Sequence, residues 1–405
     1  MPELEYKNPV AVLRNDLREI TFRANPDYEF VLLEKLPDEQ QKTLAALRND
    51  PEFSGLLIPN NGNGLTTKAV CHETAALLDM LKQPGHLPLQ VLDLMGGDAQ
   101  VTLGQLVLDG ILQVAEGSQW LCGPAACKTG DQVTMSRGES RLQQLSLEAL
   151  QHAASLKSVD VAQLCSRLYQ FNSLPLNPAW LQQFPDEYAV EECLQIQTGG
   201  RNCAVLDRYW SRIRSDEERQ TWLSWTSRTF TAASAERSVG YKLYLSPHPS
   251  AIRDAFDVWL PAISAAGAHH FKVGADARGL LRPDKIVAYF SESASLEDAA
   301  GRISRGLGGC PEQGVPFTAG FSKGALLSWG SDPPLETALP KWLQRQSWRQ
   351  WVTQRLACAL ALAKREPLGA TSAREFALLR LGLEGVDTTE WTPASTAWQS
   401  YLSAR

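Results

Sequence analysis

The clearest strand and helix signals of this chain lie in residues 241–250, YKLYLSPHPS, and in residues 269–290, HHFKVGADARGLLRPDKIVAYF. The runs "YKLYL", "FKV" and "KIVAYF" are typical of short strands, and the segment between the first two is typical of a helix. Strand and helix signals alternate as far as about residue 332. We therefore predict an α/β fold of the α+β type for this half of the chain.

Positively charged side chains gather in the same stretch. Lys242 and Tyr244 lie two residues apart in the first run, so both side chains leave one face of the strand. Lys272 lies in the second run, and the loop that leads to the third run adds Arg278, Arg282 and Lys285. Because the net charge of the chain is −6, this local excess of cations indicates an anionic ligand. Guanidinium groups suit phosphate particularly well.

A solvated basic edge of a sheet is the simpler interpretation of these cations. Against it, Lys242 and Lys272 lie inside apolar runs, where a solvated lysine is less expected. The glycine-rich segment GRISRGLGG, residues 301–309, matches neither of the common phosphate-binding glycine motifs. It needs no function as a turn or a helix end, and we keep its Arg302 and Arg305 as secondary candidates for phosphate binding.

The segment GFSKG, residues 320–324, matches the nucleophile-elbow pattern of hydrolases. That motif needs a helix after the serine and a histidine later in the chain. The residues after Ser322 do not have the pattern of a helix, and His270 is the last histidine. We therefore reject a hydrolase of this class.

Composition narrows the class of protein. A length of 405 residues is compatible with two or three domains, and 44% hydrophobic with 21% charged residues is ordinary for a globular protein. No apolar run reaches the roughly 20 residues needed to span a bilayer, and no signal peptide opens the chain. Eight scattered cysteines without a CxxC pair indicate reduced thiols rather than a zinc site. We expect a cytoplasmic protein without a metal site, which binds neither nucleic acid nor membrane.

Residues 1–128 show the pattern of a winged helix. Helical patterns at 70–83, 87–97 and 102–109 are followed by a predicted hairpin with Glu116 and Gly117 at its tip. The third helix contains no lysine or arginine, which argues against DNA as its ligand. A peptide strand added to the edge of the sheet is the better candidate, so we predict a peptide-docking module.

The rest of the chain divides into two predicted parts. Residues 129–235 look helical and amphipathic, including the segment DRYWSRIRSDEERQTWLSWTSRTF at 207–230. Residues 236–405 form the mixed α/β part, which closes with two predicted helices at 345–366 and 372–385.

The segments YKLYLSP, FKVGADARGLLRPDKIVAYF, GVPFT and SWGSDP, in this order, resemble the HopA1 family. That family comprises type III effector domains and their relatives in biosynthetic clusters for class V lanthipeptides and thioamitide-type peptides. It is more distantly similar to phosphothreonine lyases of the OspF/SpvC type and to the lyase domain of class III and IV lanthipeptide synthetases. The resemblance covers roughly the last 170 residues and implies a phosphate-eliminating lyase fold without metal or cofactor.

The resemblance also implies roles for individual residues. Lys272 would be the base that removes the α-proton of a phosphoserine or phosphothreonine, and Lys242 would contact the phosphate or the substrate carbonyl. Tyr244 stands where the effector lyases use a histidine as general acid. The phosphate could take a proton from this phenol, or leave as a dianion that needs only cations. Arg278, Arg282 and Lys285 would hold the phosphate.

These expectations describe a phosphothreonine or phosphoserine lyase. It would form dehydroamino acids in a ribosomal precursor peptide that carries a leader, together with a separate Ser/Thr kinase, and a cyclase is a further candidate partner. A non-catalytic module that binds peptides or phosphopeptides is the first alternative. The second is a type III effector that acts on phosphoproteins of a host.

Overall fold

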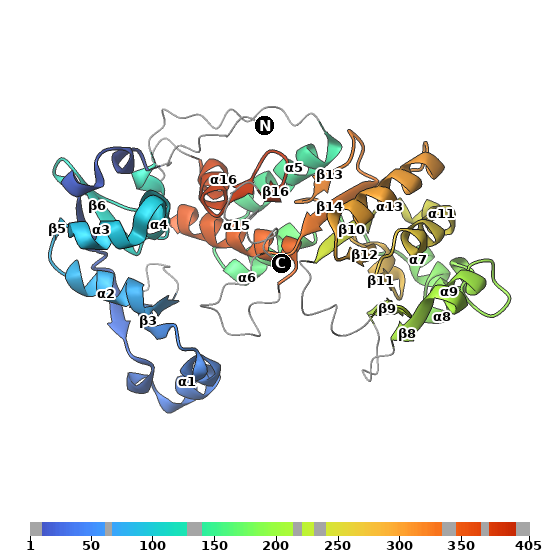
Figure 1. Ribbon diagram of the computed structural model, residues 1–405, viewed down its shortest axis with the longest axis horizontal. Coiled ribbons are helices and arrows are strands. Elements are labelled where there is room, and N and C mark those ends of the chain that lie inside the picture. Colours follow the sequence, from blue (N-terminus) through green and yellow to red (C-terminus); the bar gives the residue numbers. More distant parts are fainter. Residues whose placement is uncertain are drawn as a thin grey trace.

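The structure is a computed structural model, and it describes residues 10–60, 67–127, 140–213, 221–230, 240–333, 346–365 and 372–393. The fold is mixed α/β, as predicted. Figure 1 shows an elongated arrangement, with the N-terminal elements at one end, helix α15 (Trp348–Arg365) in the middle and the largest sheet at the other end. No helix in the described ranges combines the length and the apolar character needed to cross a bilayer.

The N-terminal part contains two small sheets and short helices. The predicted order of three helices followed by a hairpin is present, and Glu116 pairs with Gln119 across the turn of that hairpin. Gly117 occupies this turn at φ +61°, a conformation that favours glycine. The helices are α1 (Asp38–Thr43), α2 (His72–Met80), α3 (Leu89–Met95) and α4 (Ala99–Leu108). The sheets are β2 (Tyr28–Val31), β3 (Phe53–Pro59) and β4 (Lys68–Cys71), and, in spatial order, β5 (Gly85–His86), β1 (Thr21–Ala24), β6 (Leu112–Glu116) and β7 (Gln119–Leu121).

A layer of helices lies between this part and the large sheet (Figure 1). It consists of α5 (Arg141–Ser155), α6 (Val161–Tyr169), α15 and α16 (Ala373–Leu383). Capping boxes that begin at Ser140 and Ser372 start α5 and α16. The two predicted C-terminal helices are confirmed.

One hydrophobic core joins the N-terminal part to these helices. It includes Leu103 and Leu108 of α4 together with Leu356, Leu360 and Phe376 of α15 and α16. An Arg380–Asp109 ion pair and a hydrogen bond from the Gln105 side chain to the carbonyl of Leu383 cross the same contact. The core therefore crosses the predicted boundary at residue 128, and the last two helices pack mainly away from the large sheet.

The third part is a seven-stranded antiparallel sheet. Helices α11 (Ile252–Ala265) and α13 (Ser293–Gly306) pack on one of its faces, and the short helix α12 (Ala277–Leu280) follows β11. Three short helices precede β8 in the chain: α7 (Pro178–Gln183), α8 (Glu187–Cys193) and α9 (Cys203–Tyr209). The strand order is β13 (Ala319–Gly320), β14 (Leu327–Ser331), β10 (Tyr241–Leu245), β12 (Ile286–Phe290), β11 (His270–Gly274), β9 (Trp222–Ser227) and β8 (Trp210–Ile213). A separate small pair joins β15 (Val386–Asp387) and β16 (Thr392–Pro393).

The helix predicted over residues 207–230 is wrong in its main part, because β8 and β9 occupy the described residues of that segment. Leu223 and Trp225 alternate with half-buried polar residues, so burial follows the two-residue period of a strand. Trp225 stacks on Phe271 with ring centroids 4.7 Å apart. Packing against β11 thus decides the strand, while the arginines and glutamates of the segment favoured a helix.

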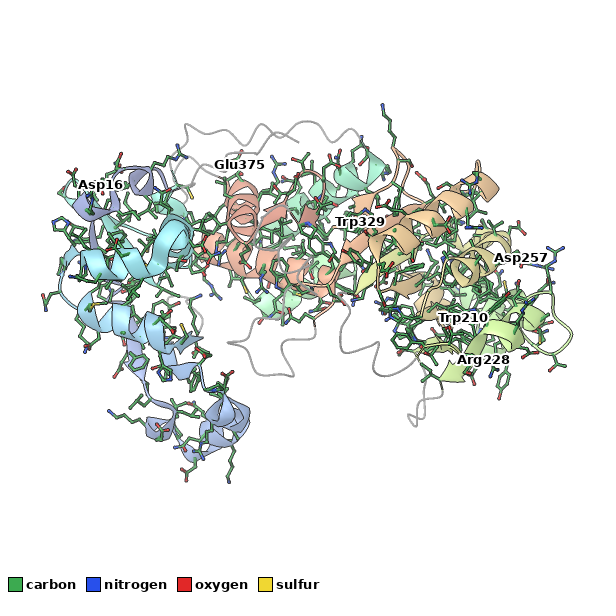
Figure 2. The ribbon with its side chains drawn as sticks, viewed as in Figure 1. Asp16, Trp210, Arg228, Asp257, Trp329 and Glu375 are labelled. Carbon is green, nitrogen blue, oxygen red and sulfur yellow. The ribbon has the colours of Figure 1, made fainter. Side chains whose placement is uncertain are left out.

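The helix-covered face of the sheet is mainly apolar, with Arg212 at its β8 edge. Trp329 of β14 and Trp210 of β8, both labelled in Figure 2, lie toward the two ends of this face. Leu243 and Phe271 lie between them and pack on Trp259 of α11. Between β13 and β14, residues 321–326 form bends and no helix, which confirms the rejection of a hydrolase elbow at Ser322.

Candidate functional site

The register of the strands brings the predicted lysines to one face. Lys242 lies opposite Tyr289, which in turn lies opposite His270, while Tyr244 and Lys272 both lie opposite Val287. Directly opposed residues of antiparallel strands share a face. The side chains that we call the polar face are therefore Trp222, Lys242, Tyr244, His270, Lys272 and Tyr289.

Lys272 is the central cation of the polar face. Its Nζ lies 4.2 Å from the ring centroid of Trp222, and among the described residues no carboxylate forms an ion pair with it. Burial, with smaller contributions from the charges of Lys242 and Arg282, lowers the pKa of Lys272 to about 8, while the charge of Asp284 opposes this shift. A larger fraction of Lys272 is therefore neutral near pH 7 than of an ordinary lysine. Such an amine can act as a base.

Arg282 approaches the same tryptophan from the loop between β11 and β12. Its guanidinium lies 5.0 Å from the Trp222 ring centroid and forks onto Asp284 at 2.9 and 3.0 Å. The loop is tight, because a Cβ added to Gly274 would lie 2.4 Å from the backbone of Gly279. The two glycines thus allow the chain to turn closely enough to bring Arg282 and Lys272 to one ring.

Asp284 connects this loop to two helices of the other core. Tyr169 of α6 donates its hydroxyl to the carboxylate at 3.0 Å, and Nη1 of Arg349 on α15 lies 2.9 Å from it. Burial alone would raise the pKa of Asp284, but the charges of Arg349 and Arg282 outweigh it and hold the pKa at about 2. Asp284, Tyr169 and Arg349 were not among the residues predicted from the sequence. A carboxylate amid three cations in "ARGLLRPDK" was the available signal for Asp284.

Lys242 and Tyr244 are more enclosed than predicted. Lys242 is buried and forms an ion pair with Asp332 at the end of β14, and its Nζ lies 5.6 Å from the Tyr289 ring centroid. Tyr244 is 3% exposed and packs on Val287 and Val315. Burial raises the pKa of Tyr244 well above its usual value, so this phenol keeps its proton throughout the neutral range.

The prediction that Lys285 holds phosphate is wrong. Its side chain is fully buried, and its Nζ donates to the carbonyl of Pro247 at 2.9 Å and to the side chain of Gln313. Burial lowers the pKa of Lys285 to about 7, with Asp284 opposing this shift. Lys285 lies just before the buried strand β12, and the loops that contain Pro247 and Gln313 cover its side chain.

The burial of Lys285 predicts a pH dependence of stability. Its pKa is about 7 in the folded chain, against an ordinary 10.5, so the unfolded chain binds one more proton between these values. The free energy of unfolding should therefore rise from pH 7 to pH 9 through this group. In Lys285→Met this rise should flatten, on top of a loss of about 1–3 kcal/mol for unsatisfied partners. Urea unfolding at pH 7, 8 and 9 measures both effects, and an unchanged slope would contradict the assignment.

The prediction that Arg302 and Arg305 reach the phosphate is also wrong. Both are exposed on α13, and this helix packs through Leu296 and Ile303 on the apolar face. The sheet itself separates them from Lys272. Arg278 lies on α12, with 59% of its side chain exposed and Asp276 4.0 Å away, so its guanidinium is exposed to solvent rather than enclosed with Lys272.

Comparisons with known proteins assign no family. No family model matches the chain, and no curated protein matches it. Two solved structures are similar to part of it, with a TM-score of 0.38 and 14% identity in both cases. They are the effector proteins from Pseudomonas syringae pv. tomato strain DC3000, which covers 64% of this chain and 99% of its own, and from Pseudomonas syringae pv. syringae strain 61, which covers 63% and 100%. These values are too low to support an argument about function.

Proposed function

We propose that the polar face binds a phosphorylated peptide and eliminates its phosphate. The observation that carries this proposal is the pairing of Lys272, whose pKa is lowered to about 8, with Arg282 on the Trp222 ring. Lys272 can accept a proton, and Arg282 can bind a phosphate dianion. Elimination from phosphoserine or phosphothreonine requires both of these functions at neighbouring positions.

The reaction balances with these groups alone. Neutral Lys272 takes the proton from Cα, the Cα–H electron pair forms the Cα=Cβ bond, and the Cβ–O bond breaks. Phosphate departs with the electron pair of that bond and is stabilised by the charge of Arg282. Lys242 would stabilise the negative charge that develops at the substrate carbonyl, once it leaves Asp332. The phosphate would leave as a dianion, because burial raises the pKa values of Tyr244 and Tyr289 and makes both phenols poor proton donors.

The substrate we propose is a precursor peptide that carries a leader. A separate Ser/Thr kinase would supply the phosphate, since the sequence holds no kinase catalytic-loop motif. The three helices and hairpin of the N-terminal part are the elements we propose for leader docking. A cyclase would then use the dehydroamino acids that the reaction forms.

Incubation of the protein with a synthetic phosphothreonine peptide tests the reaction. We expect the peptide to lose the mass of one phosphoric acid, and a thiol to add to the product. A peptide that instead loses only HPO₃ would show hydrolysis and would contradict elimination. Non-catalytic phosphopeptide binding is the second candidate function, favoured by the burial of Tyr244 and by the ion pair that occupies Lys242. Binding without any change in mass would support it.

The arginines provide a binding test with an internal control. Arg282→Ala should weaken phosphopeptide binding by about 1.5–3 kcal/mol, because a charged hydrogen bond is lost beside a tryptophan. Arg278→Ala should cost less, since that side chain is mostly exposed. Arg302→Ala removes the same group from the other side of the sheet and should leave the affinity unchanged. Equal affinities for all three variants, measured by calorimetry, would show that the phosphate does not bind at this site.

A further inference from the structure

A buried carboxylate shared by two arginines connects the two cores of the molecule. Asp284 is 4% exposed and contacts Arg282 from its own loop, Tyr169 from α6 and Arg349 from α15. Arg349 is 1% exposed, and its guanidinium also donates to the carbonyls of Pro316 and Tyr169.

Stability alone is a weak explanation for this cluster. Desolvation of buried charges often cancels their attraction, so an apolar contact of the same volume would hold the two cores together as well. The cluster also reaches the candidate site, because its outermost member is Arg282, whose side chain is 33% exposed beside Trp222. The inner members, Tyr169 and Arg349, stack on each other with 4.3 Å between the guanidinium carbon and the ring centroid.

We propose that Arg349 and Tyr169 are positioning residues of the candidate site, which hold Asp284 so that it fixes Arg282 beside Trp222, and that Arg349 offsets part of the negative charge that Asp284 exerts on Lys272. This inference rests on the proposed roles of Arg282 and Lys272. Fixing one guanidinium edge on Asp284 leaves the remaining N–H groups of Arg282 for an anion. A guanidinium held in this way loses less freedom when the anion binds.

The charged groups around Lys272 determine how its pKa should change when one of them is replaced. Asp284 favours the charged form of Lys272, whereas Lys242 and Arg282 favour the neutral form. The remaining titratable groups that face it are His270 on its own strand, Tyr289 and Tyr244 on the neighbouring strands, Tyr169 on α6 and Arg349 on α15. Burial lowers the pKa of His270 to about 4, and burial raises those of the three tyrosines. In the described part of the chain, the full charges near Lys272 around neutral pH are therefore those of Asp284, Arg349, Arg282 and Lys242, and Asp332 pairs with Lys242.

Two substitutions should therefore move the titration of Lys272 in opposite directions. Asp284→Asn removes the negative charge and should shift the midpoint to lower pH by about half to one unit. Arg349→Met leaves Asp284 less compensated and should shift the midpoint to higher pH by a similar amount. The measurement is the rate at which an amine-specific reagent labels Lys272 in the full chain at pH 6 to 10, followed by peptide mass mapping. Circular dichroism establishes that each variant is folded.

Two further variants keep the test decisive. Arg349→Lys retains a cation, so the Lys272 midpoint in this variant should stay close to that of the parent. The comparison of Arg349→Lys with Arg349→Met remains available if Asp284→Asn does not fold. Arg355 lies on α15 like Arg349 and forms an ion pair with Glu384. Arg355→Met breaks that ion pair and should leave the Lys272 midpoint unchanged. Midpoints that move in the same direction in the Asn and Met variants, or an Arg349→Lys midpoint displaced as far as that of Arg349→Met, would overturn the proposal. Opposite shifts in a protein that eliminates no phosphate would retain the positioning role and reject the lyase.

Discussion

Replacing Lys272 by arginine is expected to abolish elimination while phosphopeptide binding survives. Arginine keeps the positive charge on the polar face, but it cannot lose its proton near neutral pH. A general base contributes on the order of 10² to 10⁴ in rate, so turnover of the phosphothreonine peptide should fall at least 100-fold. The dissociation constant should stay within about threefold of the parent value, because the charge that faces the phosphate is retained.

The rate of the parent protein should depend on pH in the direction that Lys272 dictates. Its pKa of about 8 in the folded chain means that the neutral, basic form increases as the pH rises from 6 to 8. The elimination rate should therefore rise about tenfold per unit below this value and level off above it.

Arg305→Lys is the matched control, since it exchanges the same two side-chain types on the opposite side of the sheet. It should retain both the rate and its pH profile. An arginine variant at position 272 with close to the parent rate would show that Lys272 only binds the anion. The base would then have to be another group of the polar face.

Deletion of residues 1–127 is expected to unfold the central helices. The main hydrophobic core contains residues from α4 and from α15 and α16, so the deletion would expose Leu356, Leu360 and Phe376 to water. Each large apolar side chain contributes about 1.5–3 kcal/mol when buried, and a domain has only about 5–15 kcal/mol of net stability. We therefore expect a loss of cooperative thermal unfolding and of most helical circular dichroism from these helices.

A pair of leucines tests the same contact without a deletion. Leu108 of α4 is fully buried in the shared core, and Leu108→Ala should cost about 2–5 kcal/mol of the free energy of unfolding. Leu94 of α3 is 88% exposed, and Leu94→Ala should change that free energy by less than about 0.5 kcal/mol. A truncated chain that melts like the full protein, or two leucine variants of equal stability, would show that the parts fold independently.

The sequence predicted best where burial is local and periodic. The strands β10 and β12, the helices α4 and α16, and the hairpin at Gly117 follow from alternation, amphipathic spacing or turn chemistry within a few residues. The shared face of Lys242 and Tyr244 follows from the same alternation. Strand β9 was missed because the charged residues around it favour a helix, while its partner β11 lies more than forty residues further along the chain.

Which residues form the candidate site could be predicted from the sequence only in part. Sequence by itself determined that cations cluster between residues 242 and 285 in an acidic chain, because charge and strand periodicity are local properties. Only the tertiary structure decided which of these cations face a ligand: it buries Lys285 under two loops, places Arg302 behind the sheet and brings Arg282 to Lys272 on Trp222. It also brings in Tyr169 and Arg349, which lie 115 and 65 positions from Asp284 along the chain. The physical reason is that burial and charge pairing depend on distance in space, which a single sequence does not contain.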